Sequence, residues 1–344
     1  MEKTMKAVVL KDFHQPFTVE TLPIPEPGPG EVLVKVMASG LCLTDVHIQD
    51  GVLKTVKPPY TPGHELAGIV VKLGEGVTGV EVGEHMCGWI DVVCHKCRLC
   101  AMGRENLCLN RVRIGFERDG SHAEYVVIPA ENVMPIAGDI PWPSAAVIPD
   151  AVACMHNAVK VQGKVKPGDK VLIAGMGALG VPGVQIAKHL GATVYVSGRT
   201  PAKLELAEHF GADAVINTRQ QDLREEINRL TGGDLCDVII DLIGTSGCID
   251  EELRCLRPGG KIVAVAYAAE TFTVNYQEIV IKEKEIVGVR GATPESLREA
   301  IRLVGEKIVD PHVCKTWKIE DVNEAIGALR SFRNLSRTAF TFEE

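Results

Sequence analysis

Residues 169–199 constrain the fold of this chain more tightly than any other stretch. Residues 171–174 are all apolar, which is typical of a short strand buried on both faces. A glycine-rich turn follows and opens an amphipathic helical segment at 184–190, and residues 193–196 supply a second strand. Strand, turn, helix and strand within about 30 residues form a βαβ unit, so this stretch predicts a parallel α/β sheet.

The turn within this unit has the GxGxxG spacing of a dinucleotide-binding fingerprint. Gly175 permits the tight turn, Gly177 lets the backbone approach a pyrophosphate, and Gly180 lets the helix pack close to its strand. The N-terminus of the helix then faces the phosphates. Glycines also serve ordinary turns, but the strands and helix on either side favour a dinucleotide site here. The predicted contacts of the turn are Gly175, Gly177, Ala178, Leu179 and Gly180.

The chain of 344 residues is long enough for two domains. Its formal net charge of −8 argues against a nucleic acid as the main partner, because binding phosphates requires a basic face. No apolar run approaches the roughly 20 residues of a membrane span, and the first residues lack the apolar core of a signal peptide. We therefore expect a cytoplasmic protein without a membrane partner.

Secondary-structure signals divide the chain into three stretches. Short strands and turns dominate up to about residue 135, and residues 31–37 alternate as expected for a half-buried strand. Strands and helices then alternate up to about residue 289, and the tail combines two helices with a last strand at 337–342. Because this tail cannot bury itself alone, we expect it to return to the N-terminal β region. The predicted domains are residues 1–152 together with 290–344, and residues 153–289 between them.

Four of the eleven cysteines lie close together in the sequence. The spacing Cys94-x2-Cys97-x2-Cys100-x7-Cys108 allows four thiolates to surround one ion, and an all-cysteine set is typical of a closed, structural zinc site. Two alternatives are weaker. Four free thiols in a loop would oxidise readily, and the spacing differs from that of ferredoxin iron–sulfur clusters.

A second candidate metal site combines distant residues, namely Cys42, His64, Glu65 and Asp150. A thiolate, an imidazole and carboxylates are the mixed donors from which open catalytic zinc sites are built. Each residue also has a plainer interpretation, since Cys42 could be a small buried hydrophobe and His64 could cap a turn. The residue types alone leave both interpretations open.

With these motifs together, the chain resembles the zinc-containing medium-chain alcohol dehydrogenases over nearly its whole length. Residues 40–47 match the GxCxTDxH segment of that family, residues 63–68 match its GHExxG segment, and the four-cysteine lobe matches its structural zinc site. The resemblance implies an α/β fold in which a Rossmann dinucleotide-binding domain is inserted into a β-rich, GroES-like catalytic domain. It places the active site in the cleft between the two domains.

The resemblance also gives a role to each member of the scattered set. Cys42 and His64 become catalytic zinc ligands, and Glu65 becomes a nearby or exchangeable ligand. Asp150 takes the position of the third fixed ligand, where many members of the family have cysteine. An aspartate makes the zinc harder and less electron-rich than a cysteine does. Two zinc ions per chain are therefore expected, one catalytic and one structural.

The implied reaction is the reversible oxidation of an alcohol to an aldehyde or ketone, with hydride transfer to a nicotinamide and zinc polarising the oxygen. Thr44 would pass the alcohol proton through the cofactor ribose to His47, while Asp45 orients a zinc ligand. Plainer roles are a backbone-bonded hydroxyl for Thr44 and a surface position for His47. Three further positions, which could equally belong to the core, would line an apolar substrate pocket: Trp89, Ile90 and Cys154.

The end of the second strand of the βαβ unit distinguishes between the two nicotinamide cofactors. NAD enzymes place a carboxylate there for the ribose 2′-hydroxyl, whereas the guanidinium of Arg199 can bind a 2′-phosphate. NADP is therefore favoured, with NAD as the alternative, although Arg199 could also be an ordinary exposed loop residue. We assign Ser197 and Arg199 to the cofactor, and the resemblance adds Arg337, which would reach the pyrophosphate.

Two rival functions stay open. A zinc-independent enoyl or quinone reductase on the same scaffold should lack the pair Cys42 and His64. A non-catalytic protein that binds zinc and a dinucleotide would not need the proton relay of Thr44 and His47. The favoured hypothesis is an enzyme that acts on a small-molecule alcohol, aldehyde or ketone and forms a homodimer or homotetramer, as the family usually does.

Overall fold

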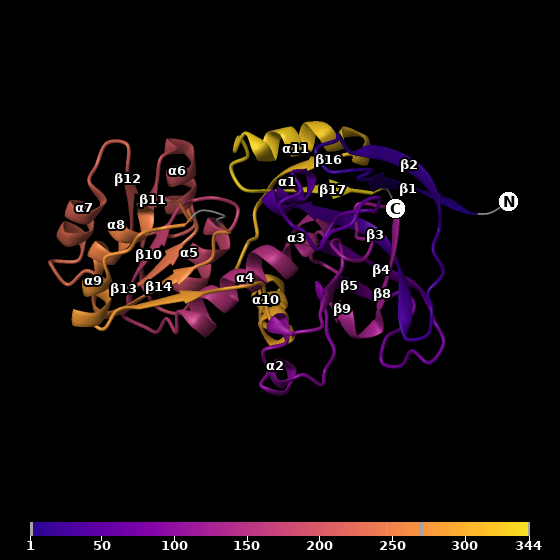
Figure 1. The fold of residues 1–344 in the computed structure, drawn as a ribbon, viewed down its shortest axis with the longest axis horizontal. Coiled ribbons are helices and arrows are strands. Elements are labelled where there is room, and N and C mark those ends of the chain that lie inside the picture. The colour runs from indigo at the N-terminus through magenta and orange to yellow at the C-terminus, as the bar shows by residue number, and fades with distance from the viewer. Residues whose placement is uncertain (1–2, 246, 268–270, 343–344) are drawn as a thin grey trace. The chain divides into compact units, whose positions relative to one another are not determined.

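The computed structural model describes residues 3–245, 247–267 and 271–342, and Figure 1 shows it as a ribbon. The chain forms two compact units. The first unit comprises Met1–Asp150, Ala292–Glu306 and Pro311–Glu344, and the second comprises Ala151–Gly291 and Lys307–Asp310. The second unit is therefore inserted into the first, which contains both ends of the chain.

A six-stranded parallel sheet forms the centre of the second unit. Its spatial order, β12-β11-β10-β13-β14-β15, is the 3-2-1-4-5-6 order of a doubly wound dinucleotide-binding sheet. Strand β10 is buried along almost its whole length, as the apolar run at 171–174 predicts. The strands are β10 (Lys170–Ala174), β11 (Thr193–Gly198), β12 (Ala214–Asn217), β13 (Cys236–Asp241), β14 (Leu256–Ala264) and β15 (Glu285–Gly288).

Helices alternate with these strands. They are α5 (Gly180–His189), α6 (Pro201–His209), α7 (Leu223–Leu230), α8 (Cys248–Cys255) and α9 (Tyr276–Ile281). Helix α5 begins at the third fingerprint glycine, four residues before the predicted segment. The sequence does not predict α8, because its buried face includes the carboxylate of Glu252 beside Ile249 and Leu253, which interrupts the apolar period.

A seven-stranded sheet forms the centre of the first unit, in the order β16-β17-β3-β4-β5-β9, with β8 also paired to β3. Its pairs are antiparallel except for β16 and β17. The strands are β3 (Glu31–Leu41), β4 (Glu65–Leu73), β5 (His85–Gly88), β8 (Tyr125–Pro129), β9 (Val133–Pro135), β16 (Val313–Trp317) and β17 (Arg337–Thr341). A separate ribbon pairs β1 (Thr4–Val9) with β2 (Thr18–Pro23).

Strand β3 is the central strand of this sheet. The prediction of a half-buried strand at 31–37 is wrong, because β3 is buried on both faces along most of its length. Strands β4, β8 and β17 pair with it, and helix α3 (Trp142–Val147) packs against it. Packed neighbours on both faces override the alternation of its sequence.

Two segments that are distant in sequence meet at the C-terminal end of β3. Strand β17 runs antiparallel to β3 with Thr338 opposite Leu41, so the tail of the chain lies beside the residues that follow β3. Helix α1 (Leu43–Gln49) packs there against α11 (Val322–Arg330), as Figure 1 shows. The sequence predicts no helix in this β-rich stretch, because seven residues are too few to display a helical period.

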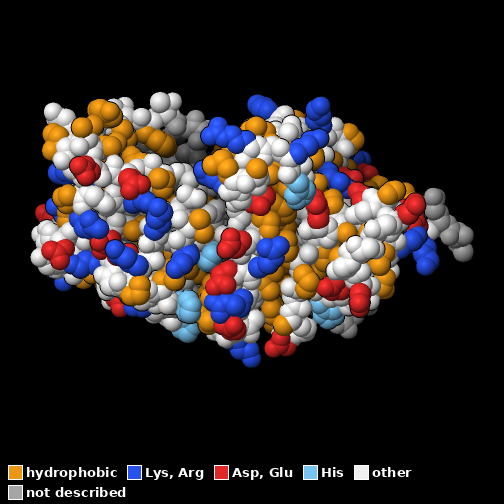
Figure 2. Space-filling view, turned by 90° about the horizontal axis from the view of Figure 1, so that it is seen from below, with side chains coloured by type: hydrophobic (Ala, Val, Ile, Leu, Met, Phe, Trp, Pro, Cys, Tyr) orange, Lys and Arg blue, Asp and Glu red, His pale blue; other side chains and the backbone are white. Residues whose placement is uncertain are grey.

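The charges on the surface are mixed. On the face drawn in Figure 2, the described Lys and Arg side chains are interspersed with Asp and Glu rather than gathered into a broad basic patch. This distribution is in keeping with the acidic net charge and gives a phosphate backbone no evident path on that face. Among the described residues, no helix is both long enough and apolar enough to cross a membrane.

Candidate active site

Cys42, His64, Glu65 and Asp150 come together within the first unit. Their ligand atoms all lie within 4.8 Å of one another. Cys42 Sγ is 3.5 Å from Asp150 Oδ2, and His64 Nε2 is 3.8 Å from Glu65 Oε1 and 3.9 Å from Asp150 Oδ2. The structure thus joins the scattered set that the sequence singles out, and we call these four residues the mixed-donor cluster.

Strand pairing and one irregular helical turn build this cluster. Gly40 on β3 lies opposite Glu65 on β4, so the chain continues from β3 to Cys42 beside the start of β4. Cys42 is the residue before the first turn of α1. Asp150 lies in a π-helical segment, Ile148–Val152, that follows α3. Such π-turns occur preferentially at functional sites, where they redirect a side chain.

The mixed-donor cluster favours a positive charge. The side chains of His64 and Glu65 are 3% and 0% exposed, and Glu65 Oε2 has no hydrogen-bond partner among the described residues. Burial alone would lower the pKa of the His64 imidazole, but Asp150 and Cys42 raise that pKa to about 10. A thiolate, an imidazole and carboxylates that converge around one point suit a zinc ion. The donors therefore fit the expected metal.

Arg337 occupies a position that the sequence does not predict. It begins β17, is 2% exposed, and its Nη2 contacts Glu65 Oε1 and lies 3.7 Å from Asp150 Oδ2. The pairing of β17 with β3 brings it to the cluster, so no local motif could have revealed this contact. The expected contact of Arg337 with a pyrophosphate stays a prediction.

Asp45 links two members of the cluster. Its Oδ2 accepts a hydrogen bond from the backbone N–H of Cys42 at 2.9 Å, and its Oδ1 lies 3.9 Å from His64 Nδ1. Burial alone would raise the pKa of the Asp45 carboxyl, but His122 and His64 hold that pKa below its usual range. Because Nδ1 of His64 faces this carboxylate, Nε2 is the nitrogen directed at Glu65 and Asp150.

Thr44 and His47 lie three residues apart on α1. Thr44 Oγ1 is 3.4 Å from Cys42 Sγ, which places this hydroxyl at the edge of the mixed-donor cluster. His47 is half-buried. Burial lowers the pKa of its imidazole, Asp50 opposes that effect and Arg330 adds to it. His47 is therefore neutral near pH 7 and able to accept a proton.

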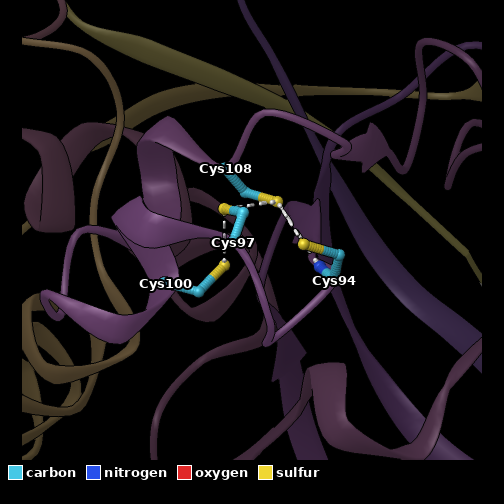
Figure 3. A group of neighbouring side chains, drawn as sticks. All are labelled: Cys94, Cys97, Cys100 and Cys108. Carbon is cyan, nitrogen blue, oxygen red and sulfur yellow. Dashed lines mark hydrogen bonds between the residues drawn. The ribbon is translucent and has the colours of Figure 1, made fainter.

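Cys94, Cys97, Cys100 and Cys108 form a second cluster in the first unit, shown in Figure 3. The sulfur atoms are 3.5 Å apart for Cys94 and Cys108, 3.5 Å for Cys97 and Cys100, and 3.9 Å for Cys97 and Cys108. Sulfurs that surround a zinc ion tetrahedrally at about 2.3 Å are roughly 3.8 Å apart, so these positions fit the ion. We call this group the cysteine lobe.

Short secondary elements hold the cysteine lobe together. Strands β6 (Asp91–Val92) and β7 (Val112–Arg113) pair at its base, and helix α2 (Arg98–Ala101) carries Cys100. Backbone N–H groups of Cys94 and Asn110 donate to Cys108 Sγ, each at 3.4 Å. The backbone N–H of Lys96 and the side chain of Asn110 lower the pKa of the Cys94 thiol to about 6, which favours the thiolate that binds metal.

The fingerprint glycines lie between β10 and α5 in the second unit. Gly175 has a φ of +98°, a left-handed conformation that favours glycine. A Cβ on Gly177 would meet no atom within 4 Å, so this backbone is open to a ligand. A Cβ on Gly180 would lie 2.7 Å from Met176 Sδ, so the close packing expected of the third glycine is with the turn itself. Ala178 and Leu179 complete the turn, and Leu179 precedes the first residue of α5.

A cavity of about 320 Å³ opens on this turn. Besides Gly175 and Gly177, its lining includes Ser197 and Arg199 at the end of β11, as the sequence predicts for a cofactor pocket. Residues that the sequence does not single out also line this cavity, among them Lys203, Thr218 and Glu252. Lys203 lies in the first turn of α6, four residues after Arg199, and could have been found as a second cation near it.

The expected substrate-pocket residues are divided between the two units. Trp89 and Ile90 belong to the first unit and Cys154 to the second. Trp89 donates to the carbonyl oxygen of Ala292 at 3.0 Å and lines a cavity of about 480 Å³ together with charged residues, among them Arg298. Ile90 packs instead against a hydrophobic core cluster. The cavity beside Trp89 is therefore more polar than the expected apolar pocket.

Comparisons with known proteins agree with this arrangement. Residues 28–138 match the alcohol dehydrogenase GroES-like domain, and residues 178–306 match the zinc-binding dehydrogenase family. L-threonine 3-dehydrogenase of Rhizobium rhizogenes (strain K84 / ATCC BAA-868) is 32% identical over 337 residues, which cover 96% of this chain and 97% of that protein.

Two solved structures extend the comparison. A NAD-dependent alcohol dehydrogenase superposes with a TM-score of 0.93 at 30% identity and covers 98% of this chain and 100% of that chain. A putative zinc-binding dehydrogenase from Sinorhizobium meliloti 1021, bound to NADP, superposes with a TM-score of 0.91 at 30% identity. The match covers 99% of this chain and 100% of that chain.

A GroES-like domain with an inserted Rossmann-type domain and two groups of zinc donors defines a class of dehydrogenases, and the predicted fold class is confirmed. The chain belongs to the zinc-dependent medium-chain alcohol dehydrogenase family. It is an oxidoreductase that oxidises alcohols with zinc and a nicotinamide dinucleotide.

Proposed function

We propose that this chain catalyses the reversible, NADP-linked oxidation of a small alcohol to an aldehyde or ketone, with the mixed-donor cluster as its catalytic metal site. The observation that carries this proposal is the convergence of Cys42, His64 and Asp150 next to the hydroxyl of Thr44. A bound zinc ion would supply the positive charge that polarises the oxygen of the alcohol or carbonyl, and NADP would accept the hydride.

The metal ligands in this proposal are Cys42 Sγ, His64 Nε2 and one carboxylate oxygen of Asp150. Asp45 fixes two of them, because it accepts the N–H of Cys42 and faces Nδ1 of His64. Glu65, whose carboxylate contacts Arg337, is the nearby or exchangeable ligand. The cysteine lobe would hold a second, structural zinc ion, because its four thiols leave no open position.

The proton of the alcohol would leave along α1. Thr44 is next to the donors and can accept and pass on a proton, but its hydroxyl cannot keep the charge. His47 lies one helical turn further on. Its imidazole is neutral near pH 7, so it can accept the proton and hold the positive charge. The cofactor ribose would connect the two side chains, as the family resemblance implies.

The preference for NADP rests on the cations of the cavity at the glycine turn. Arg199 is exposed there, in the position where NAD enzymes carry a carboxylate, and Lys203 lines the same cavity. A guanidinium can hold a 2′-phosphate through two parallel hydrogen bonds. The relatives differ on this point, since one solved structure is described as NAD-dependent and another contains NADP.

A cofactor and substrate panel tests the proposal. Purified enzyme should oxidise one or more alcohols, L-threonine included because of the relative of that name, with NADP favoured over NAD by about 10- to 100-fold in kcat/KM. Arg199→Asp should erase or invert this preference, whereas Glu208→Gln, at an exposed position on the same helix as Lys203, should keep it. Equal efficiency with both cofactors would contradict the NADP assignment.

The same panel separates the rival functions. A zinc-independent reductase would reduce enones or quinones and keep its activity after zinc is removed with a chelator. A binding protein would take up zinc and the dinucleotide without turnover.

We further propose that the chain works in the cytoplasm as a homodimer or homotetramer, with Trp89, Ile90 and Cys154 near the substrate. Sedimentation analysis and substitutions at these three positions would test these points.

A further inference from the structure

A chain of buried polar side chains leads away from Asp45 and is not explained by the ligands themselves. Ser39 Oγ lies 2.7 Å from Ser121 Oγ and 2.7 Å from His122 Nδ1. His122 Nε2 lies 3.6 Å from Asp45 Oδ1. Ser39, Ser121 and Asp45 are 0% exposed and His122 is 1% exposed. Neither His122 Nε2 nor Asp45 Oδ1 has a hydrogen-bond partner among the described residues, so the two atoms face each other as a buried electrostatic contact. Buried polar groups are costly unless they interact, which makes this contact significant.

The hydrogens of this chain can be assigned by counting. A neutral imidazole carries one N–H, and only a protonated Nε2 is compatible with the carboxylate of Asp45 opposite it. Nδ1 of His122 must then accept, so Ser39 donates its only hydrogen to Nδ1. Ser121 then donates to Ser39 at 2.7 Å in preference to the carbonyl oxygen of Glu65, which lies 3.3 Å from Ser121 Oγ. The hydrogen bonds of this row of side chains therefore all point the same way, from Ser121 through Ser39 to His122, and the N–H on His122 Nε2 faces Asp45.

The backbone of His122 is fixed to the segment that carries the His64 ligand. The N–H of His122 donates to the carbonyl oxygen of Pro62 at 3.0 Å, and the N–H of Ser121 donates to that of Gly63 at 2.8 Å. A Cβ on Gly63 would lie 2.6 Å from Nδ1 of His122, so the imidazole packs directly on the turn before His64. The ring of Phe340 also packs edge-on against the imidazole, with 5.0 Å between the two ring centroids.

We propose that His122 is a positioning residue of the catalytic metal site: its Nε2–H, fixed by Ser39 and Ser121, attracts the Asp45 carboxylate across 3.6 Å, and this carboxylate in turn orients His64 and Cys42. This inference rests on the proposed metal site. Asp45 meets both imidazoles with the same oxygen, Oδ1, while Oδ2 holds the N–H of Cys42. Loss of the His122 donor would let the carboxylate rotate away from His64, and the ligand would lose its fixed direction.

The tautomer provides a test that needs no activity. In ¹⁵N-histidine-labelled enzyme loaded with zinc, His122, identified by the signal that disappears in His122→Gln, should show a protonated Nε2 and an unprotonated Nδ1. An Nδ1-protonated ring would overturn the proposal. The wild-type enzyme must first hold two metal equivalents; if it holds only the ion of the cysteine lobe, the proposed catalytic site itself fails and the result is distinguishable.

Metal release provides the second test. Partners behind a metal ligand typically change metal affinity by 10- to 100-fold, so His122→Phe should release the catalytic ion to a chelator about 10-fold faster. His122→Gln keeps an N–H donor and should restore most of the wild-type rate. Ser39→Ala should lie between the two, and Ser296→Ala, a buried serine outside this row, should behave as wild type. The release rate of the ion in the cysteine lobe should stay constant throughout.

Cobalt substitution distinguishes positioning from a general loss of stability. With Co²⁺ in the catalytic site, the visible absorption band should shift in His122→Phe and return in His122→Gln. Identical bands and release rates in wild type and His122→Phe would overturn the proposal. If His122→Phe does not fold, Ser39→Ala and the tautomer of the wild-type ring decide the matter.

Discussion

The two metal clusters of the first unit are built in opposite ways. The cysteine lobe takes all four donors from residues 94–108, and short turns and one pair of two-residue strands place them. The mixed-donor cluster takes Cys42 and Asp150 from positions 108 residues apart, and it depends on the pairing of β3 with β4 and on a π-helical segment. The first cluster is encoded locally, whereas the second exists only when the whole unit is folded.

This difference predicts opposite consequences when one donor is removed. A locally encoded cluster stabilises its own segment, since binding of a structural zinc ion is part of the folding free energy of the loops around it. An assembled cluster in an already folded core contributes chemistry, and its loss should leave the fold in place. The predictions below test that division, beginning with the largest expected effect.

The largest effect should follow Asp150→Ala. Removing one of three fixed donors should release the catalytic ion and lower turnover by roughly 10³-fold or more, because metal polarisation contributes several kcal/mol to such reactions. Metal analysis should fall from two equivalents to one, with little change in thermal unfolding. Asp139→Ala, at an exposed carboxylate of the same unit, should keep both ions and full activity. Retained activity in Asp150→Ala would contradict its place among the ligands.

Cys100→Ser should produce the reverse pattern. The cysteine lobe should lose its ion and the free energy of unfolding should drop by on the order of 3 kcal/mol, while the catalytic ion stays in place. Turnover per catalytic metal, measured well below the unfolding temperature, should change much less than in Asp150→Ala. The matched control is Cys314→Ser, because Cys314 is exposed and far from either cluster in sequence. If the cysteine lobe lost its zinc ion and the free energy of unfolding did not change, the claim that this ion stabilises the fold would be contradicted.

The same division explains what the sequence could predict. The parallel βαβ unit, the glycine turn and the cysteine lobe depend on spacings within short stretches, and the structure has them as expected. The mixed-donor cluster could be named only through a family resemblance, because nothing local connects Cys42 with Asp150. Two features had no signal in the sequence at all. The contact of Arg337 with Glu65 and the row from Ser121 to Asp45 arise from pairing between distant strands and loops.

His47→Gln should have an intermediate effect and tests a residue placed by local spacing. General bases contribute about 10²-fold at the low end, so alcohol oxidation near neutral pH should fall by about that factor. The pKa of His47 lies below its usual value, so the wild-type rate should decline only in acid, where the ring is protonated. His47→Gln should lose that decline in acid, and small buffer bases should partly restore its rate. The control variant His209→Gln should match the wild type. An unchanged pH–rate profile would mean that the proton leaves by another route.

Glu252, in the second unit, also depends on the assembled fold, and the sequence does not single it out. It lies on α8, is 1% exposed, lines the cavity at the glycine turn, and neither carboxylate oxygen has a hydrogen-bond partner among the described residues. Burial, together with Asp241 and Glu251, raises the pKa of Glu252 from 4.5 to about 9. At neutral pH this carboxyl is therefore protonated and does not repel the phosphate of a dinucleotide.

The last prediction concerns stability rather than turnover and follows from this raised pKa. In the unfolded chain Glu252 loses its proton near pH 4.5, whereas in the folded chain it keeps the proton up to about pH 9. Between these values the folded state binds more protons, so its stability declines as the pH rises. Glu252→Gln removes that dependence and should match the wild type at pH 5 yet exceed its free energy of unfolding by up to about 4 kcal/mol at pH 8. Denaturant unfolding at both pH values measures the difference. Glu205→Gln, at an exposed position of the same unit, is the control that should show little change. If Glu252→Gln gained nothing at pH 8, the Glu252 carboxyl would already be ionised in the folded chain, which would contradict its raised pKa.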